Sequence, residues 1–138
     1  MKKIEEITIY QNPNPLLVSK QGIFPGVSLL PNNDLLTIFS IGQAFDSSDQ
    51  RAFVSKSKDD GRTWSTPKQL HNHKYDNCEE TDTLKPLLLN NGDLIATGYA
   101  FIRPDPLTPI VDPISFDVLP LKNKISFSSD DGESWSVP

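Results

Sequence analysis

The chain has 138 residues, a formal net charge of −5 at pH 7 and twelve prolines. Its basic residues form no cluster that could neutralise phosphates, which argues against a nucleic-acid partner. No run approaches the roughly 20 apolar residues of a membrane-spanning helix, and the single cysteine, Cys78, excludes an intrachain disulfide. This composition favours a β-rich, turn-rich protein without a membrane span.

The N-terminus has a basic start, but no apolar run follows residues 1–6. A secretion signal needs such a run, so the segment is not read as one. We therefore expect a soluble, cytoplasmic protein.

Apolar alternation and turn residues predict strands in two groups. The first group comprises residues 22–30, 35–41, 51–57 and 63–70. The second comprises residues 83–89, 94–101 and 124–128, with a further strand that starts at Ser134. Four short strands per unit, repeated along the chain, are typical of β-propeller blades.

Two sequence landmarks repeat in the same order. Residues 30–36 (LPNNDLL) recur as 89–95 (LNNGDLI), and residues 57–64 (SKDDGRTW) recur as 128–135 (SSDDGESW). The spacing between the two landmarks is twelve residues longer in the second unit. Such internal repetition indicates a fold built from similar units.

Each landmark has the chemistry of a tight turn. Asn and Gly tolerate positive φ, so the first landmark predicts a hairpin turn between two strands. In the second landmark, Gly61 and Gly132 are expected at left-handed positions. Asp59 and Asp130 are expected to accept backbone hydrogen bonds within the loop. The tryptophan that ends each copy is expected to start the next strand and pack on a neighbouring sheet.

The second landmark resembles the Asp-box, or BNR repeat, of sialidases and related glycosidases, whose pattern is Ser-x-Asp-x-Gly-x-Thr-Trp. The resemblance covers roughly residues 22–138 and places the motif between the third and fourth strands of a blade. It implies an all-β, sialidase-like β-propeller, of which the chain carries two four-stranded antiparallel blades from a six-bladed ring. In the family the motif is structural and performs no chemistry. The matching positions are Ser57, Asp59, Gly61, Thr63, Trp64, Ser128, Asp130, Gly132, Ser134 and Trp135.

The resemblance divides the chain into three parts. Residues 1–21 form an N-terminal segment in which residues 4–10 are a candidate ring-closing strand. Residues 22–75 form the first blade and residues 76–138 the second. Two blades leave two apolar faces open, because a propeller has about four to eight blades. The chain is then either a fragment of a longer propeller, which we favour, or a subunit that self-associates through these faces.

The first blade departs from the family at one important position. Sialidases hold the substrate carboxylate with three arginines, the first of which stands in an Arg-Ile-Pro segment. The matching residues here are 22–26 (GIFPG), with Ile23 in the place of the arginine. The resemblance therefore implies a carbohydrate ligand or substrate, but not true sialidase activity. The tyrosine nucleophile and its glutamate would lie in blades beyond this chain.

The family's acid/base aspartate lies in the loop between the second and third strands of the first blade. Asp46 and Asp49 are the candidates in that loop, and Arg51 at its end is a weaker candidate for a sugar contact. A proton donor there needs a raised pKa, which burial against a bound sugar would supply. The alternative is that this Asp-Ser-Ser-Asp run is a solvated turn.

The extra residues of the second unit fall in the equivalent loop, residues 103–120. Five prolines predict an extended, stiff segment rather than a helix. This insertion is a candidate wall or lid over a sugar site, with Arg103 and Asp105 as weak candidates for contacts. A surface excursion or a subunit contact is the alternative.

The segment between the two units contains His71, His73, Tyr75 and Cys78. A linker offers no fixed ligand geometry, so we expect no metal site and no cofactor. The acidic residues 79–82 are predicted as a solvated turn that can still reach the central face and a sugar hydroxyl.

Two functions remain open from the sequence. The first is a sialidase-like glycoside hydrolase that acts on another sugar and is inactive as this chain alone. The second is a non-catalytic propeller that binds a glycan or a protein. The acidic loop favours the first, and Ile23 favours the second.

Overall fold

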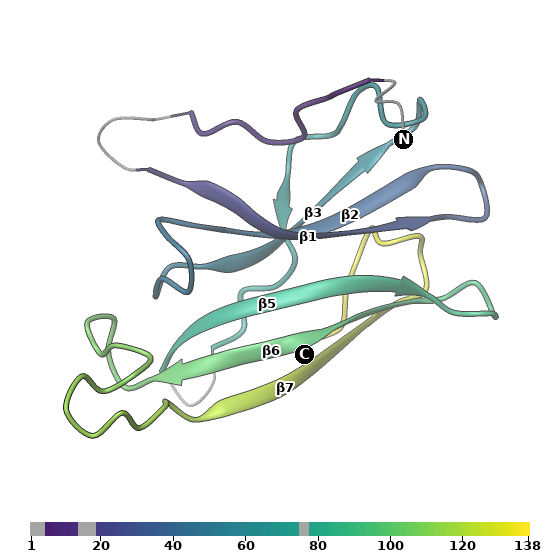
Figure 1. Ribbon diagram of the computed structural model, residues 1–138. Coiled ribbons are helices and arrows are strands. Elements are labelled where there is room, and N and C mark those ends of the chain that lie inside the picture. The colour runs from purple at the N-terminus through teal and green to yellow at the C-terminus, as the bar shows by residue number, and fades with distance from the viewer. Residues whose placement is uncertain (1–4, 14–18, 75–77) are drawn as a thin grey trace.

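The computed structural model describes residues 5–13, 19–74 and 78–138, in which seven strands form two antiparallel sheets (Figure 1). The first sheet has the order β1-β2-β3-β4 and the second β5-β6-β7. The prediction of an all-β fold is confirmed for the described residues, which contain no helix that could cross a membrane. The strands are β1 (Gln21–Leu29), β2 (Leu35–Gly42), β3 (Arg51–Ser57), β4 (Lys68–Gln69), β5 (Glu79–Leu88), β6 (Leu94–Arg103) and β7 (Leu121–Ser128).

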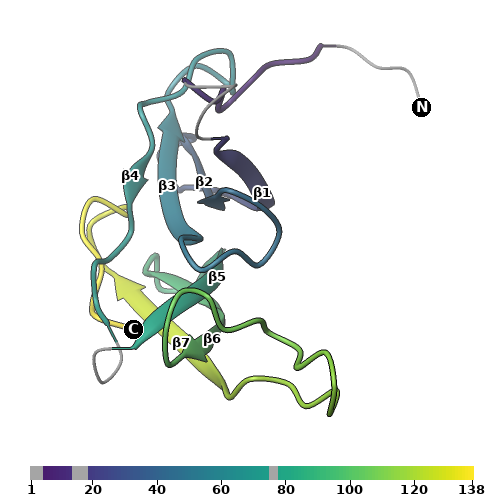
Figure 2. The same ribbon diagram turned by 90° about the vertical axis from the view of Figure 1, so that its left-hand side faces the viewer.

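The inner faces of the two sheets pack against each other (Figure 2). β5 lies against β1, β2 and β3 of the first sheet. Leu84 of β5 is fully buried there, as are Leu36 and Ile38 of β2. Burial of one such side chain contributes about 1.5–3 kcal/mol, so this contact is a main source of stability. The other buried members of the core are Leu30, Ala52, Val54, Leu70, Leu94 and Ala96.

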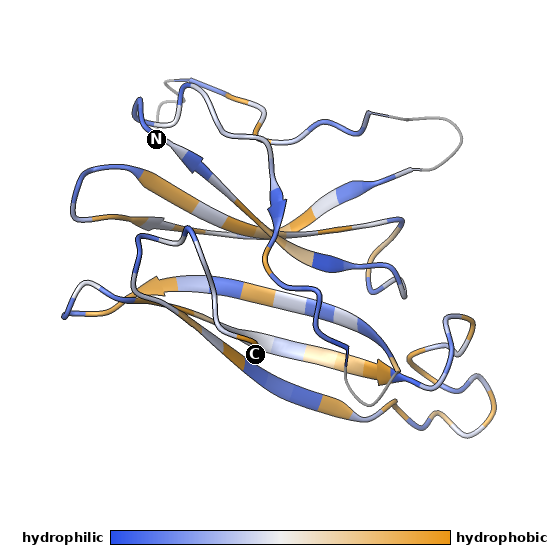
Figure 3. Ribbon diagram, turned by 180° about the vertical axis from the view of Figure 1, so that it is seen from behind, coloured by the Kyte–Doolittle hydropathy of each residue, from blue (hydrophilic) through white to orange (hydrophobic). Residues whose placement is uncertain are grey.

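Both sheets carry exposed apolar side chains, including Val27 and Leu29 of β1, which are 62% and 58% exposed. Tyr10 of the N-terminal segment packs on Phe39 of β2, with ring centroids 6.1 Å apart. On the second sheet, Leu87, Ile125 and Phe127 are 44–55% exposed. β7 carries hydrophobic segments on either side of a hydrophilic one (Figure 3). The outer face of the second sheet is therefore an exposed apolar surface.

The hairpin turns lie where the sequence predicts them. Asn33 has a φ of 69° between β1 and β2, and Gly92 has a φ of 92° between β5 and β6. Both stand at the same position of the repeated landmark, and the amide of each donates to a leucine carbonyl three residues earlier. Asn and Gly are the residues that accept this left-handed conformation at little cost.

The fourth strand of the first sheet is much shorter than predicted. The sequence predicts residues 63–70, whereas β4 comprises only Lys68–Gln69. Thr63 gives its amide to Asp59 in the preceding loop, and Pro67 has no amide to give. The segment still returns alongside β3, since the amides of Ser65 and Leu70 donate to the carbonyls of Lys56 and Ala52, but these bonds are too few to extend the strand.

The second sheet has three strands in the described residues, where the sequence predicts a fourth from Ser134. Ser134 instead donates its amide to Asp130. The amide of Ser136 donates to the carbonyl of Phe127 at 2.8 Å, so the chain does return alongside β7. The segment after Ser134 thus lies beside β7 as predicted, but its pairing with β7 is too short to form a strand.

The acidic residues 79–82 are not the solvated turn that the sequence predicts, because they form the start of β5. Glu80 is 2% exposed and Asp82 is 1% exposed. Lys124 on β7 pairs with Glu80, and His71 faces Asp82. The ion pair with a residue distant in the sequence thus makes the burial of Glu80 tolerable, whereas both carboxylate oxygens of Asp82 lack a hydrogen-bond partner among the described residues.

The N-terminal segment and the insertion can also be compared with their predictions. Residues 5–10 form no strand, and Ile4 lies outside the described residues, so the proposed ring-closing strand stays a prediction. The insertion contains no helix, as predicted, but it folds back on itself through a bridge between Val111 and Val118. The carboxylate of Asp112 accepts the amides of Ile114 and Ser115 at the tip of this fold.

Candidate functional site

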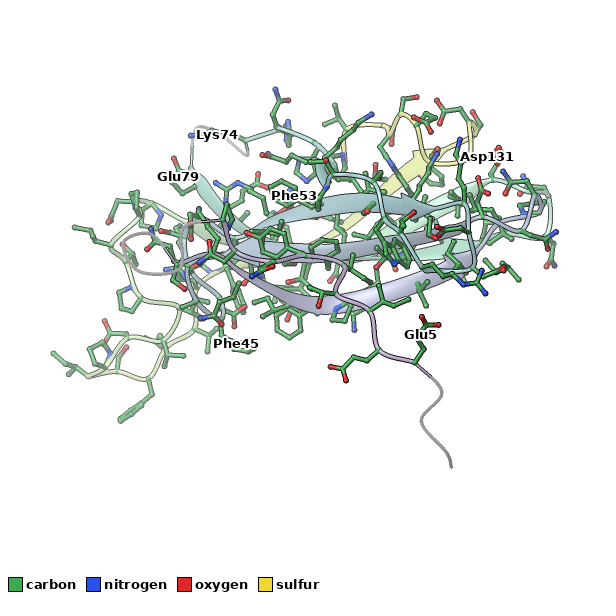
Figure 4. All side chains as sticks on the ribbon, turned by 90° about the horizontal axis from the view of Figure 1, so that it is seen from above. Glu5, Phe45, Phe53, Lys74, Glu79 and Asp131 are labelled. Carbon is green, nitrogen blue, oxygen red and sulfur yellow. The ribbon has the colours of Figure 1, made fainter. Side chains whose placement is uncertain are left out.

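The two ends of the strands carry different kinds of connection. One end has the two hairpin turns and the two repeated loops, residues 57–64 and 128–135. The other end has the β2–β3 loop, residues 43–50, and the β6–β7 loop, residues 104–120. Phe45, Lys74 and Glu79 lie at this second end, opposite Asp131 (Figure 4). We call it the β2–β3 end.

The repeated loop at residues 57–64 is closed by its own side chains. Asp59 Oδ1 accepts the amide of Thr63 at 2.8 Å, and Oδ2 accepts the Thr63 hydroxyl at 2.7 Å. The Ser57 hydroxyl adds a third hydrogen bond, to Oδ1 at 2.8 Å. The Thr63 amide, its hydroxyl and Ser57 hold the pKa of Asp59 at about 2. The carboxylate is thus ionised and fully occupied inside the loop.

The loop at residues 128–135 repeats this arrangement. Asp130 accepts the hydroxyl and the amide of Ser134 together with the Ser128 hydroxyl, which hold its pKa at about 2. Trp135 lies in no strand, and its indole N–H donates to the carbonyl of Gly132 at 3.2 Å. Trp64 makes the same contact with Gly61 and also lies in no strand. The prediction that the two tryptophans start strands is therefore wrong. Neither carboxylate is free to act on a ligand.

At the β2–β3 end, Asp46 has the features of a proton donor. Its backbone amide donates to the side chain of Gln50 at 3.0 Å, and its φ of 54° is unusual for a residue with a side chain. Its Oδ1 atom is buried and has no hydrogen-bond partner among the described residues. Burial raises the pKa of Asp46, although the nearby charge of Arg103 opposes the shift.

Asp49, the other acid/base candidate, has the opposite environment. It pairs with Lys20 and accepts the amide of Gln43 at 3.0 Å and the hydroxyl of Ser47 at 2.7 Å. Burial alone would raise the pKa of Asp49, but these hydrogen bonds and the charge of Lys20 lower it. Asp49 therefore fixes the loop as a carboxylate, and Asp46 is the stronger acid/base candidate.

Arg103, at the end of β6, joins the two loops of this end. Its Nη2 donates to the carbonyl of Asp46 at 2.6 Å, and its Nη1 donates to the carbonyl of Thr108 in the insertion. Its Nε donates to the hydroxyl of Thr81 on β5 at 3.0 Å. The side chain is buried, and burial lowers the pKa of Arg103. Arg103 acts as a clamp between the sheets and is not positioned to meet a ligand.

The other two weak candidates are also engaged within the protein. Arg51 donates to the carbonyls of Ser48, Gln50 and Glu80 and pairs with Glu79 at 3.0 Å. Asp105 accepts the hydroxyl and amide of Thr108 and the amide of Leu107, and the Thr108 hydroxyl contributes most to lowering the pKa of Asp105. Both residues shape the loops of this end.

An aromatic pair beside Asp46 was missed in the sequence. Phe24 and Phe45 meet edge to face with centroids 5.2 Å apart, and Phe45 is 67% exposed. Phe24 has a φ of 54° and lies at the irregularity in the β1–β2 register. Phe24 follows Ile23 directly and Phe45 precedes Asp46, so both lie in segments that the sequence analysis had already singled out for other residues. Only the bulge brings the rings together.

A buried polar cluster under this end was also missed. Gln50 donates to the carbonyl of Asp82 and to the hydroxyl of Thr83, which ties the β2–β3 loop to β5. Nε2 of His71 lies 2.9 Å from Oδ2 of Asp82, without the alignment of a hydrogen bond. In the described part of the chain, no three His, Cys, Asp or Glu side chains gather as a metal-binding group. Tyr75 lies outside the described residues.

No protein-family model matches the chain, and no curated protein matches it. Solved structures do resemble it. A crystal structure of a protein of unknown function from Dyadobacter fermentans is 25% identical, with a TM-score of 0.70 over 99% of this chain. The match covers 39% of that protein. The chain therefore spans less than half of this structural relative.

Two carbohydrate-active proteins have the same fold at lower identity. A Hadza microbial sialidase is 16% identical, with a TM-score of 0.60 over 81% of this chain and 24% of its own. An ulvan lyase, a polysaccharide lyase bound to -[GlcA(1-4)Rha3S]-, is 16% identical, with a TM-score of 0.53 over 77% of this chain and 23% of its own. The two sheets of this chain are thus blades of a sialidase-like β-propeller fold.

Proposed function

We propose that the chain supplies two blades of a carbohydrate-active propeller and that the β2–β3 end binds the sugar. The buried, unpaired Oδ1 of Asp46 carries this proposal. A buried carboxyl oxygen without a partner is costly, and a ligand hydroxyl or glycosidic oxygen would supply the missing hydrogen bond once a shift of the β2–β3 loop uncovers this atom. The raised pKa of Asp46 suits an acid/base role in the complete protein.

The aromatic pair supports the same assignment. One face of a sugar ring is lined by C–H groups, which pack on an aromatic ring, while its hydroxyls need polar partners. Phe45 offers an exposed ring, and Phe24 holds that ring in place. Asp46 follows Phe45 in the chain, so apolar and polar contacts to one sugar are available together.

The comparisons support a carbohydrate function in general. Two of the matching structures are named as a sialidase and a polysaccharide lyase. Since the chain spans only 23–39% of the three matching proteins, we assign turnover to a complete ring and binding to this end.

Binding of the full chain to a glycan array tests the proposal. We expect selective binding that Phe45→Ala weakens by about tenfold or more, because ring stacking contributes a substantial part of sugar affinity. Asp46→Asn should weaken it as well. Asp60→Asn is the matched control, since Asp60 lies in a repeated loop at the opposite end. Absence of binding to any glycan, or equal binding by Phe45→Ala, would contradict the proposal.

Hydrolysis is the second arm of the test. A panel of aryl glycosides that includes a sialoside, and uronate-containing polysaccharides for lyase activity, are suitable substrates. In the complete protein, Asp46→Asn should reduce turnover by about 100-fold or more, as loss of a general acid does. The corresponding change at Asp49 should have a much smaller effect, because Asp49 is held as a carboxylate by Lys20.

Glycan binding without catalysis is the second candidate function. Ile23 stands where the family has an anchoring arginine, and both Arg51 and Arg103 are occupied by internal acceptors. Array binding by the complete protein, with no turnover of any substrate in the panel, would favour this function over the first.

A further inference from the structure

Among residues 5–13, 19–74 and 78–138, the basic side chains around the β2–β3 end have partners within the protein. Lys20 pairs with Asp49, and Lys74 pairs with Glu79 at 2.7 Å. Lys124 is 8% exposed and is paired with Glu80. Together with the arginines, these residues are engaged by loop carbonyls or by carboxylates of the same end.

The two arginines are the most strongly held of these groups. Each donates to acceptors of different segments, and Arg103 is only 4% exposed. A guanidinium that bound a ligand carboxylate would first have to release buried carbonyls, which costs free energy for every unsatisfied acceptor. Neither arginine is thus available to an anionic sugar.

The remaining charge at this end is negative. Asp46 and Asp105 lie close enough to Arg103 to affect its pKa, and neither forms an ion pair with it. Asp112, at the tip of the insertion, is also exposed. An approaching carboxylate or sulfate would meet these like charges, and the cations that the structure describes at this end already have internal partners, whereas a neutral hydroxyl meets no such repulsion.

From these contacts we propose that the β2–β3 end selects an uncharged sugar and rejects its acidic counterpart. The inference rests on the proposed function, and it specifies the substrate class of the same site. Phe45 supplies the surface for an apolar sugar face, and the carboxylate of Asp46 accepts a hydroxyl. Selectivity arises because the cations that the structure describes at this end already have internal partners.

Matched pairs of oligosaccharides test this inference with the full chain. The two members of a pair share length and linkage and differ only in a hydroxymethyl or a carboxylate group at C6, as in glucose and glucuronate. By calorimetric titration we expect the neutral member to bind at least about tenfold more tightly than the acidic one. Its affinity should be insensitive to salt between about 20 and 500 mM, because no exposed ion pair forms with the ligand.

A variant that releases one cation gives the reciprocal test. Asp49→Asn removes the carboxylate partner of Lys20, so the discrimination between the members of a pair should fall by about threefold or more. Asp60→Asn removes an equal charge at the opposite end and should leave discrimination unchanged. Thermal unfolding and the affinity for the neutral member show whether the Asp49 variant is folded.

The outcomes separate this inference from the function on which it rests. Binding to neither member of any pair overturns the proposed sugar-binding function itself. Equal or tighter binding of the acidic members leaves that function standing and overturns the selectivity for uncharged sugars. The same holds for an affinity of the neutral member that falls steeply with salt.

Discussion

The two ends of the blades stabilise their loops in different ways. At the end with the repeated loops, each loop satisfies its own carboxylate, and the pKa of Asp59 and of Asp130 falls to about 2. At the β2–β3 end, the loops depend on a buried arginine from the other sheet, and the pKa of Asp46 is raised by burial. The first end is locally complete, whereas at the second the Oδ1 atom of Asp46 has no hydrogen-bond partner among the described residues.

The largest expected effect comes from removing the clamp between the sheets. Arg103→Ala leaves the carbonyls of Asp46 and Thr108 and the hydroxyl of Thr81 without a donor. Since a hydrogen bond to a charged group contributes about 1.5–3 kcal/mol, we expect a loss of about 4 kcal/mol in the free energy of unfolding. Urea denaturation of the variant and of the unmodified chain measures this loss.

The control for this change is an arginine at the opposite end. Arg62 has a side chain that is 65% exposed and lies 3.8 Å from Asp60. Arg62→Ala should therefore cost less than about 0.5 kcal/mol. Equal losses for the two variants would show that the β2–β3 end does not depend on the clamp.

A smaller effect distinguishes the two repeated loops from each other. Gly61 and Gly132 have φ values of 85° and 80°, so replacement by alanine strains both by about 1 kcal/mol. A Cβ at Gly132 would also lie 2.3 Å from Cδ1 of Leu36, in the core of the first sheet. The nearest atom at Gly61 would be 3.4 Å away.

We therefore expect Gly132→Ala to lower the free energy of unfolding by about 2–3 kcal/mol and Gly61→Ala by about 1 kcal/mol, because overpacking adds to the strain. Chemical denaturation of the two variants side by side measures the difference. An equal loss would mean that the second loop does not press on the neighbouring sheet.

The smallest effects concern pH, and they have opposite signs at the two ends. The pKa of Asp59 is lowered in the folded state, so its contribution is present above its ordinary value of 3.8 and is lost as pH falls towards about 2. The pKa of Asp46 is raised, so stability is present at low pH and is lost as pH rises through the folded pKa.

Thermal unfolding between about pH 2 and pH 7 checks these signs. Relative to the unmodified chain, Asp59→Asn should lower the melting temperature at neutral pH, and the difference should vanish near pH 2. Asp46→Asn should raise it at neutral pH and have no effect at low pH. A lower melting temperature for Asp46→Asn at neutral pH would contradict the assigned environment of Asp46.

Much of the fold could be predicted from the sequence because its signals are local. Alternation placed β2 and β3 almost to the residue, and Asn33 and Gly92 marked the turns through their tolerance of positive φ. The strand that follows each repeated loop could not be judged in this way. Its length depends on which amides the loop has already used, as at Thr63.

The β2–β3 end was less predictable because its contacts join residues distant in the sequence. The loop that contains Asp46 was identified, but nothing nearby distinguishes Asp46 from Asp49. That distinction depends on Lys20, which precedes β1, and on Arg103, which ends β6. Glu80 looked solvated for the same reason, since its partner Lys124 lies two strands away.

The Arg103 clamp also has a consequence for motion. Its three acceptors belong to the β2–β3 loop, the insertion and β5, so none of these segments can shift far without breaking a buried contact of another. A displacement of the insertion would be passed to the backbone of Asp46. The two loops should therefore move as one body rather than independently.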